Sequence, residues 1–142
     1  MNNDLILQPM VVMMLLTASI WLVLFAKRIP AMRAAKLPTQ TYTTPDKTVE
    51  LLPESVSYPS NNLKNLFELP VLFYVICLLL YVTNNVDGID VAAAWSFVAF
   101  RALHSLVHIT INIVMVRFLC YLVASIALWL LLIRAAIDVF GA

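Results

Sequence analysis

Residues 5–26 read LILQPMVVMMLLTASIWLVLFA and are followed directly by Lys27 and Arg28. As an α-helix this uncharged stretch would be about 33 Å long, at roughly 1.5 Å per residue, which suffices to cross a hydrocarbon layer of roughly 30 Å. A cleaved signal peptide is the alternative, but Asp4 stands where such a peptide carries positive charge, and the apolar run is longer than usual. The stretch predicts a membrane-spanning helix.

The composition of the whole chain supports a membrane environment. Of 142 residues, 63% are hydrophobic and 12% are charged, against roughly 25% charged in ordinary soluble domains. A mean hydropathy of +0.92 with a net charge of +1 is the opposite of a disordered composition. The nine basic residues form no stripe of the kind that binds nucleic acid. Two cysteines and two glycines exclude a disulfide scaffold and a glycine-rich phosphate loop.

Three further apolar stretches predict three more spans, at residues 66–83, 91–111 and 117–137. Between the first and second spans we expect a polar loop, 27–64, which holds five of the seven prolines and six of the nine basic residues. The expected fold is all-α, a four-helix transmembrane bundle in a single membrane domain that comprises residues 1–142.

The distribution of basic residues predicts the orientation of the bundle. Six lie in the first loop, none precedes Leu5, and none lies in the turn between the second and third spans. Because basic residues favour the cytoplasmic side, we expect a multi-pass protein of the bacterial inner membrane with both termini outside the cytoplasm.

Polar residues interrupt the third span on one face of its predicted helix. At 100° per residue, positions 101, 104, 105, 108 and 112 fall together, and they hold Arg101, His104, Ser105, His108 and Asn112. Arg101 lies ten residues into the span, near the expected midplane, where an ionised side chain costs on the order of 2.5 to 3.5 kcal/mol. It therefore needs a compensating partner, and Glu68 is the natural counter-ion for Arg101 or for another buried base.

Two other spans carry shorter polar lines. Near the start of the second span these are Lys64, Asn65 and Glu68, and in the fourth span they are Arg117, Tyr121 and Ser125. One interpretation is that such groups only join helices through buried hydrogen bonds, each worth about 1 kcal/mol. The other is that they converge on a cationic pocket. His104 and His108 alone do not make a metal site, since no further histidine is present.

The run from Arg101 through His104 to His108, followed by Arg117 and Tyr121, closely resembles the signature of the MAPEG family, the membrane-associated proteins of eicosanoid and glutathione metabolism. The stretch from Lys64 to Glu68 is similar to that family's Arg-Asn-x-x-Glu motif. The resemblance covers residues from about 61 to 137 and points to a bacterial-type member.

The resemblance implies a homotrimer that binds glutathione between subunits near the cytoplasmic side. The glutathione-contacting or pocket-forming positions implied are Lys64, Asn65, Glu68, Arg101, His104, His108, Arg117 and Tyr121, with Arg28 as a looser match. Three positions depart from the pattern: Lys64 replaces arginine, His108 replaces the tyrosine of the catalytic members, and Phe118 replaces the serine of the prostaglandin-synthesising branch. These changes argue against that branch's isomerase activity and leave thiol binding open.

Glutathione brings carboxylates, an ammonium and a thiol, so its site needs cations, an acid such as Glu68, and a positive group at the sulfur. A nearby guanidinium lowers the pKa of a thiol, normally about 8.5, and Arg117 is the expected catalytic residue, with Tyr121 as hydroxyl donor. We expect a glutathione-dependent transferase or peroxidase, with glutathione as co-substrate and a lipophilic electrophile or hydroperoxide arriving from the lipid bilayer. The alternative is a non-catalytic member that binds a lipid or presents it to a partner. A channel or proton path is a more distant alternative.

Overall fold

The computed structural model describes residues 2–141, and this part of the chain is helical apart from short connections. In chain order the elements are η1 (Asn3–Ile6), α1 (Leu7–Ala35), η2 (Thr39–Tyr42), α2 (Pro45–Leu51), α3 (Glu54–Leu66), α4 (Leu69–Val82), α5 (Gly88–Ile109) and α6 (Val114–Phe140). No β-strand occurs among the described residues.

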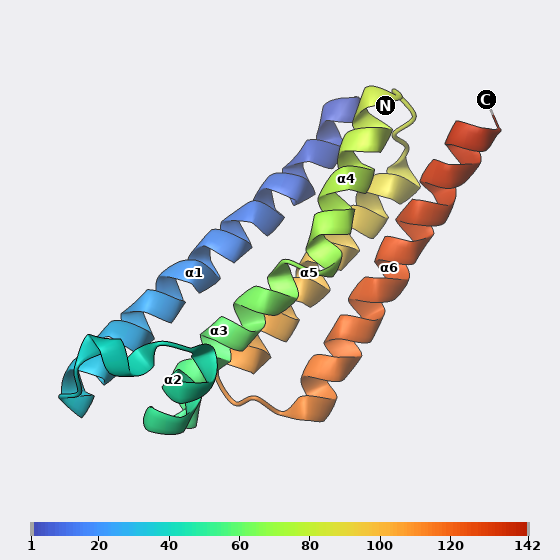
Figure 1. The fold of residues 1–142 in the computed structure, drawn as a ribbon. Helices are drawn as coiled ribbons and strands as arrows, with labels where there is room; N and C mark the ends of the chain where they lie inside the picture. Colours follow the sequence, from blue (N-terminus) through green and yellow to red (C-terminus); the bar gives the residue numbers. More distant parts are fainter. Residues whose placement is uncertain (1, 142) are drawn as a thin grey trace.

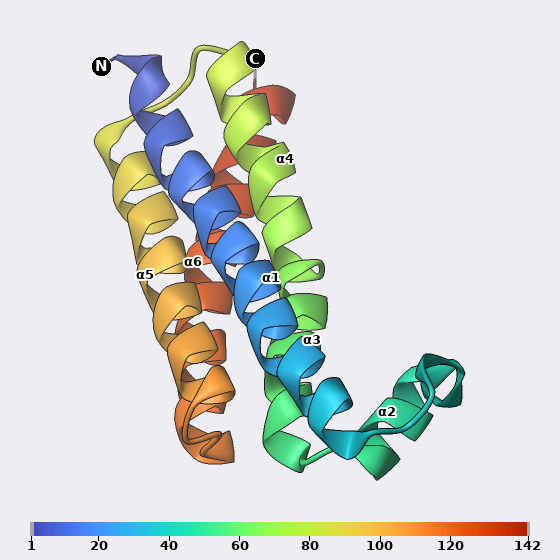
Figure 2. The ribbon, with the colours of Figure 1, turned by 90° about the vertical axis from the view of Figure 1, so that its left-hand side faces the viewer.

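The long helices lie side by side as a bundle, in which α3 and α4 together make one of the four columns (Figure 1). Both chain ends lie at one end of the bundle, and the connection from α1 to α3 lies at the other, where α2 projects sideways (Figure 2). Over the described residues, four helical segments are long and apolar enough to cross a membrane. The chain is a multi-pass membrane protein, and the predicted all-α, four-helix transmembrane bundle is confirmed.

The expected polar loop at 27–64 is wrong over most of its length. Helix α1 continues to Ala35 and α3 already begins at Glu54. The prolines suggested a loop, but they do not interrupt the helices here. Pro30 and Pro59 lie inside helices, and Pro45 begins α2 after the Thr44 cap. A proline at the first helical position loses no helical hydrogen bond, and one inside a helix removes a single bond without always ending the helix.

The second span is a composite of two helices. Helix α4 has 14 residues, about 21 Å at 1.5 Å per residue, too short to cross the bilayer. Helix α3 extends it, so that Glu54–Val82 forms one span with a break at Phe67 and Glu68. Glu68 leaves the helical conformation with φ −100° and ψ −107°, and Pro70, which has no N–H, follows in the first turn of α4.

The core is built by apolar side chains that the helices turn toward one another. Phe73 of α4 and Phe97 of α5 are both fully buried and stack with their ring centroids 4.5 Å apart. Many leucine, isoleucine and valine side chains instead face outward, among them Leu22, Leu106 and Ile126. Such an apolar exterior is expected where the surroundings are lipid.

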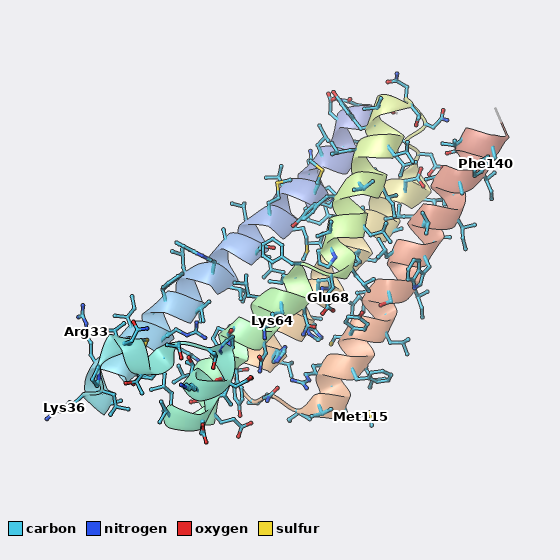
Figure 3. The ribbon with its side chains drawn as sticks, in the orientation of Figure 1. Arg33, Lys36, Lys64, Glu68, Met115 and Phe140 are labelled. Atoms are coloured by element: carbon cyan, nitrogen blue, oxygen red, sulfur yellow. The ribbon has the colours of Figure 1, made fainter. Side chains whose placement is uncertain are left out.

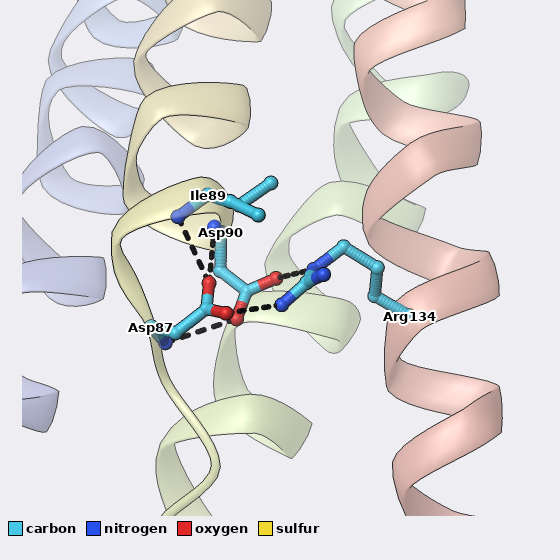
Figure 4. Close-up of polar contacts among 4 residues, drawn as sticks. All are labelled: Asp87, Ile89, Asp90 and Arg134. Atoms are coloured by element: carbon cyan, nitrogen blue, oxygen red, sulfur yellow. Dashed lines mark hydrogen bonds and ion pairs between the residues drawn. The ribbon is translucent and has the colours of Figure 1, made fainter.

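At the end that holds the chain termini, an ion-pair cluster ties α5 to α6 (Figure 4). Asp87 caps α5 by accepting hydrogen bonds from the N–H groups of Ile89 and Asp90, and the Asp90 carboxylate accepts one from the Asp87 N–H. Arg134 of α6 donates to both acids, to Asp87 at 2.5 Å and to Asp90 at 2.6 Å. The N–H groups of Asp90 and Ile89, with the Arg134 guanidinium, hold the pKa of Asp87 below its ordinary value.

At the opposite end, α1 is joined to the end of α5. The Lys27 ammonium donates a hydrogen bond of 2.9 Å to the carbonyl oxygen of Ile109, the last residue of α5. A cation is favoured there because the last carbonyls of a helix have no partner within the helix and carry partial negative charge. The Arg134 ion pairs thus hold the first end of α5 against α6, and the Lys27 hydrogen bond holds its last end against α1.

Candidate functional site

The polar face of α5 is directed into the bundle. Arg101, His104, Ser105 and His108 are between 0% and 4% exposed, although each stands in a helix whose intervening residues are apolar. Arg101 is the fourteenth of the 22 residues of α5. By helical rise it lies about 12 Å from the end of α5 at Ile109. Arg101 is therefore displaced from the expected midplane toward the end of the bundle that is rich in basic residues, opposite the chain termini.

The break between α3 and α4 supplies the partner of Arg101. In a continuous helix the carbonyl of Asn65 would accept from the N–H of residue 69, but the helix ends at Leu66, so this oxygen is free. The Nη2 of Arg101 donates a hydrogen bond of 2.7 Å to it. The carbonyl also lies at the negative end of α3, so it compensates part of the buried charge.

The expected pairing of Arg101 with Glu68 is therefore wrong. Glu68 is exposed and forms no ion pair with Arg101 within the described residues. Figure 3 labels Lys64 on α3 and Glu68 at the break between α3 and α4. The hydrogen bond to Arg101 is accepted by the main-chain oxygen of Asn65, so a backbone carbonyl takes the place that the sequence assigned to the Glu68 carboxylate.

Helix α6 completes the site. The Arg101 guanidinium carbon lies 5.5 Å from the centre of the Tyr121 ring, and the His104 ring centroid is 5.9 Å from that of Tyr121. The rings of His104 and His108 are 5.6 Å apart. Arg117, half-buried, donates to the side-chain oxygen of Asn112 at 2.6 Å. We call Arg101, His104, Ser105, His108, Arg117 and Tyr121 the polar cluster.

The hydrogen bonds of His104 determine which nitrogen carries its proton. Nδ1 lies 2.8 Å from the carbonyl oxygen of Arg117, and a carbonyl can only accept, so Nδ1 is the donor. In the neutral ring Nε2 then holds the lone pair. This atom is buried and has no partner among the described residues, so it is available as a proton acceptor.

Several other polar atoms of the cluster are buried without a partner. Within residues 2–141 these are Nε and Nη1 of Arg101 and Nδ1 of His108, besides His104 Nε2. A buried polar group with no hydrogen bond costs about 1 to 3 kcal/mol. Some hydrogen bonds of the cluster do join helices, but these four buried atoms take part in none of them, and joining helices alone does not require such unsatisfied groups.

The structure separates Lys64 from the polar cluster. Its side chain is exposed and lines a cavity together with Arg28 of α1. Asn65 contributes to the cluster through its backbone oxygen. The sequence-predicted residues thus divide into a buried group on α5 and α6 and a cationic group on α1 and α3.

One residue of the site was missed from the sequence. Asn62 of α3 is fully buried, and its side-chain oxygen accepts a hydrogen bond of 3.3 Å from the Ser105 hydroxyl. The signal was available, because Asn62 precedes Asn65 by three residues and so shares its helix face. The polar, proline-containing sequence indicates a loop up to residue 64, and in a loop the helical spacing of Asn62 and Asn65 carries no meaning.

The comparisons with known proteins agree with this architecture. A sequence model of the MAPEG family matches residues 6–137, nearly the whole chain. The chain belongs to the MAPEG family. No curated protein and no solved structure matches it. The family match overlaps all four spans and includes every residue of the polar cluster, and it confirms the family suggested by the sequence.

Proposed function

We propose that this MAPEG protein binds glutathione at the polar cluster and uses the thiol against a lipophilic electrophile or hydroperoxide. The observation that carries the proposal is the group of unpartnered buried atoms on Arg101, His104 and His108, beside the Arg117 guanidinium and the Tyr121 ring. Placing such groups in an apolar bundle is costly, and an anionic ligand that offers several acceptors and one thiol donor would satisfy them.

The chemistry assigns a role to each group. Arg101 and Arg117 would bind the carboxylates or hold the sulfur as thiolate, since an adjacent guanidinium favours the ionised thiol. His104 Nε2 can receive the thiol proton, because its Nδ1 is already engaged as a donor to Arg117. Tyr121 can donate its hydroxyl to the sulfur or to the acceptor molecule.

Two reactions are consistent with this arrangement. In a conjugation, the thiolate forms a bond from sulfur to carbon of the electrophile, and a leaving group departs or the product takes up a proton. In a reduction, the thiolate attacks the terminal oxygen of a hydroperoxide and the oxygen–oxygen bond breaks, and the departing alkoxide takes up the proton held on His104 to leave as an alcohol. A second glutathione then converts the resulting sulfenic acid to the disulfide and water.

The co-substrate would enter from the bilayer. Phe118 and Leu122, which flank the cluster residues of α6, are exposed and apolar, and lipid is the expected medium around them. We further infer that the protein acts as a homotrimer and that its basic end faces the cytoplasm. Six of nine basic residues lie between positions 27 and 64, at the end opposite the termini.

Glutathione titration of the detergent-solubilised protein tests the proposal. We expect saturable binding at or below millimolar concentration, with an ultraviolet thiolate absorbance that disappears in Arg117→Ala. Lys47→Ala removes an exposed cation of α2, outside the polar cluster, and serves as the matched control. If the wild type binds hydrophobic ligands but not glutathione, the protein is instead a non-catalytic lipid-binding member.

A further inference from the structure

A polar cavity lies at the basic end of the bundle, outside the polar cluster. It has a volume of about 230 Å³ and is enclosed by the end of α1, by the segment from η2 into α2, and by α3. The lining residues that matter for binding are Arg28, Tyr42, Thr43, Thr44, Ser60 and Lys64. The size is below that of sites for drug-sized ligands, which begin at about 300 Å³, so the cavity suits a small group.

Two hydrogen-bonding atoms of the cavity residues are buried and unused. Arg28 Nε and the Tyr42 hydroxyl have no partner within the part of the chain that the structure describes. Leaving such groups unsatisfied is unfavourable. They belong to different segments, α1 and η2, so the connection between the two folds back to bring unused donors together.

The charge of the cavity is uniformly positive. Arg28 and Lys64 line it, and no lining residue is acidic. A neighbouring cavity of about 190 Å³ shares Tyr42 and adds Arg33 and Lys36, again with no acidic lining residue. Figure 3 shows Arg33 and Lys36 at the end of α1, beyond the bundle's apolar columns. Four cations surrounding one tyrosine predict an anionic ligand.

The remaining donors favour a phosphate group over a carboxylate. The Thr48 hydroxyl already donates to the Thr44 carbonyl, but the Thr44 oxygen accepts from the Lys47 N–H and keeps its own proton to donate. Together with Thr43 and Ser60 the cavity offers guanidinium, ammonium and hydroxyl donors. This combination is the one that proteins use for phosphate oxygens.

The depth of the cavity places it where lipid headgroups lie. Arg28 follows the uncharged stretch 5–26 by two residues, so it emerges at the boundary of the hydrocarbon layer. Basic pockets between membrane helices at this level bind phosphate-bearing headgroups. We propose that this cavity binds a phosphate group, carried by an anionic phospholipid or by a free phosphate ester.

This assignment differs from the glutathione role that the sequence predicted for Lys64. On α3, Asn62 contacts Ser105 of the polar cluster, whereas Lys64 lines the cavity with Arg28. The two sites thus use different faces of one helix, and phosphate binding does not depend on the proposed thiol chemistry.

The test uses the full chain in lipid nanodiscs made of phosphatidylcholine with or without phosphatidylglycerol, with retained lipid measured by native mass spectrometry. Glycerol 3-phosphate is titrated separately into protein in neutral detergent. Arg28→Gln and Tyr42→Phe remove the two unused donors. Lys47→Gln is the matched control, because it removes an exposed cation from the same segment that lines neither cavity.

We expect at least a tenfold loss of phosphatidylglycerol retention or glycerol phosphate affinity in Arg28→Gln, about threefold to tenfold in Tyr42→Phe, and no change in Lys47→Gln. Lipid retention without glycerol phosphate binding identifies a headgroup site, and binding of both identifies a general phosphate site. Equal retention in all variants overturns the proposal, as does displacement of the phosphate ligand by glutathione. Tyr42→Phe removes only a hydroxyl, so it keeps the test valid if Arg28→Gln fails to fold.

Discussion

Replacing Asp90 with alanine tests the cluster that fastens α5 to α6. The Asp90 carboxylate is fully buried and serves two donors at once, Arg134 Nε at 2.6 Å and the Asp87 N–H at 3.0 Å. Asp90→Ala removes both bonds. Because α6 carries Arg117 and Tyr121, the same contact also keeps two residues of the polar cluster opposite Arg101 and His104.

The expected loss of stability follows from the two bonds. A lost capping interaction costs about 1 kcal/mol, and a hydrogen bond to a charged group is worth about 1.5 to 3 kcal/mol. Asp87 retains its own contact with Arg134, which reduces the total, so we expect a loss of about 2 to 3 kcal/mol. Asp90→Asn keeps an acceptor of the same shape and should lose about half as much.

The assay is reversible unfolding in mixed detergent, followed by far-ultraviolet circular dichroism. Asp138→Ala provides the control, since Asp138 lies on α6 and makes no hydrogen bond or ion pair among the described residues. We expect the control to stay within about 0.5 kcal/mol of the wild type. If Asp90→Ala loses no more than Asp138→Ala, the cluster does not stabilise the bundle and the reasoning is refuted.

Three further predictions concern stability. Phe73→Ala should cost about 2 to 3 kcal/mol, mainly from a cavity of roughly 100 Å³ where Phe73 stacks on Phe97, and a loss under 1 kcal/mol contradicts the packing described. Asn62→Leu should change the free energy of unfolding by less than about 1 kcal/mol, because the Asn62 side chain makes one long hydrogen bond, to Ser105, and its Nδ2 has no partner within the described residues. A loss above about 3 kcal/mol would show a structural role for Asn62. Because the pKa of Asp87 is lowered in the folded state, its carboxylate adds to the free energy of unfolding fully above about pH 4, and this addition is lost as the pH falls through the lowered pKa. The pH dependence that Asp87 causes should be absent from unfolding curves of Asp87→Asn.

The spans could be predicted because lipid imposes a simple rule on sequence. Long apolar stretches located all four spans, and residues 91–111 and 117–137 lie inside or within two residues of α5 and α6. The boundaries of the second span could not be predicted. The polar residues at 54–66, with Pro59 among them, still form a helix, because α3 is stabilised by packing on α1 and α5 that local sequence does not reveal.

The composition of the polar cluster followed from helical periodicity, but its partners did not. Positions 101, 104, 105 and 108 fall on one face whatever the surroundings. The acceptor for Arg101 is the backbone carbonyl of Asn65, which is free because the helix breaks after Leu66. Sequence reasoning pairs side chains of opposite charge and therefore favours Glu68, since it does not show which backbone carbonyls are free. The pairing of Arg134 with Asp87 and Asp90 was also missed, since it depends on how α5 and α6 face each other.

The central claim is that the buried cations of α5 are kept for a ligand and not for stability. Arg101→Met tests it most directly, because replacing a buried charge with an apolar side chain of similar volume is often neutral or stabilising. Glutathione affinity and the free energy of unfolding are measured on the same preparation. The account predicts at least a tenfold loss of affinity with no loss of stability, whereas unchanged affinity with a stability loss of several kcal/mol would contradict it.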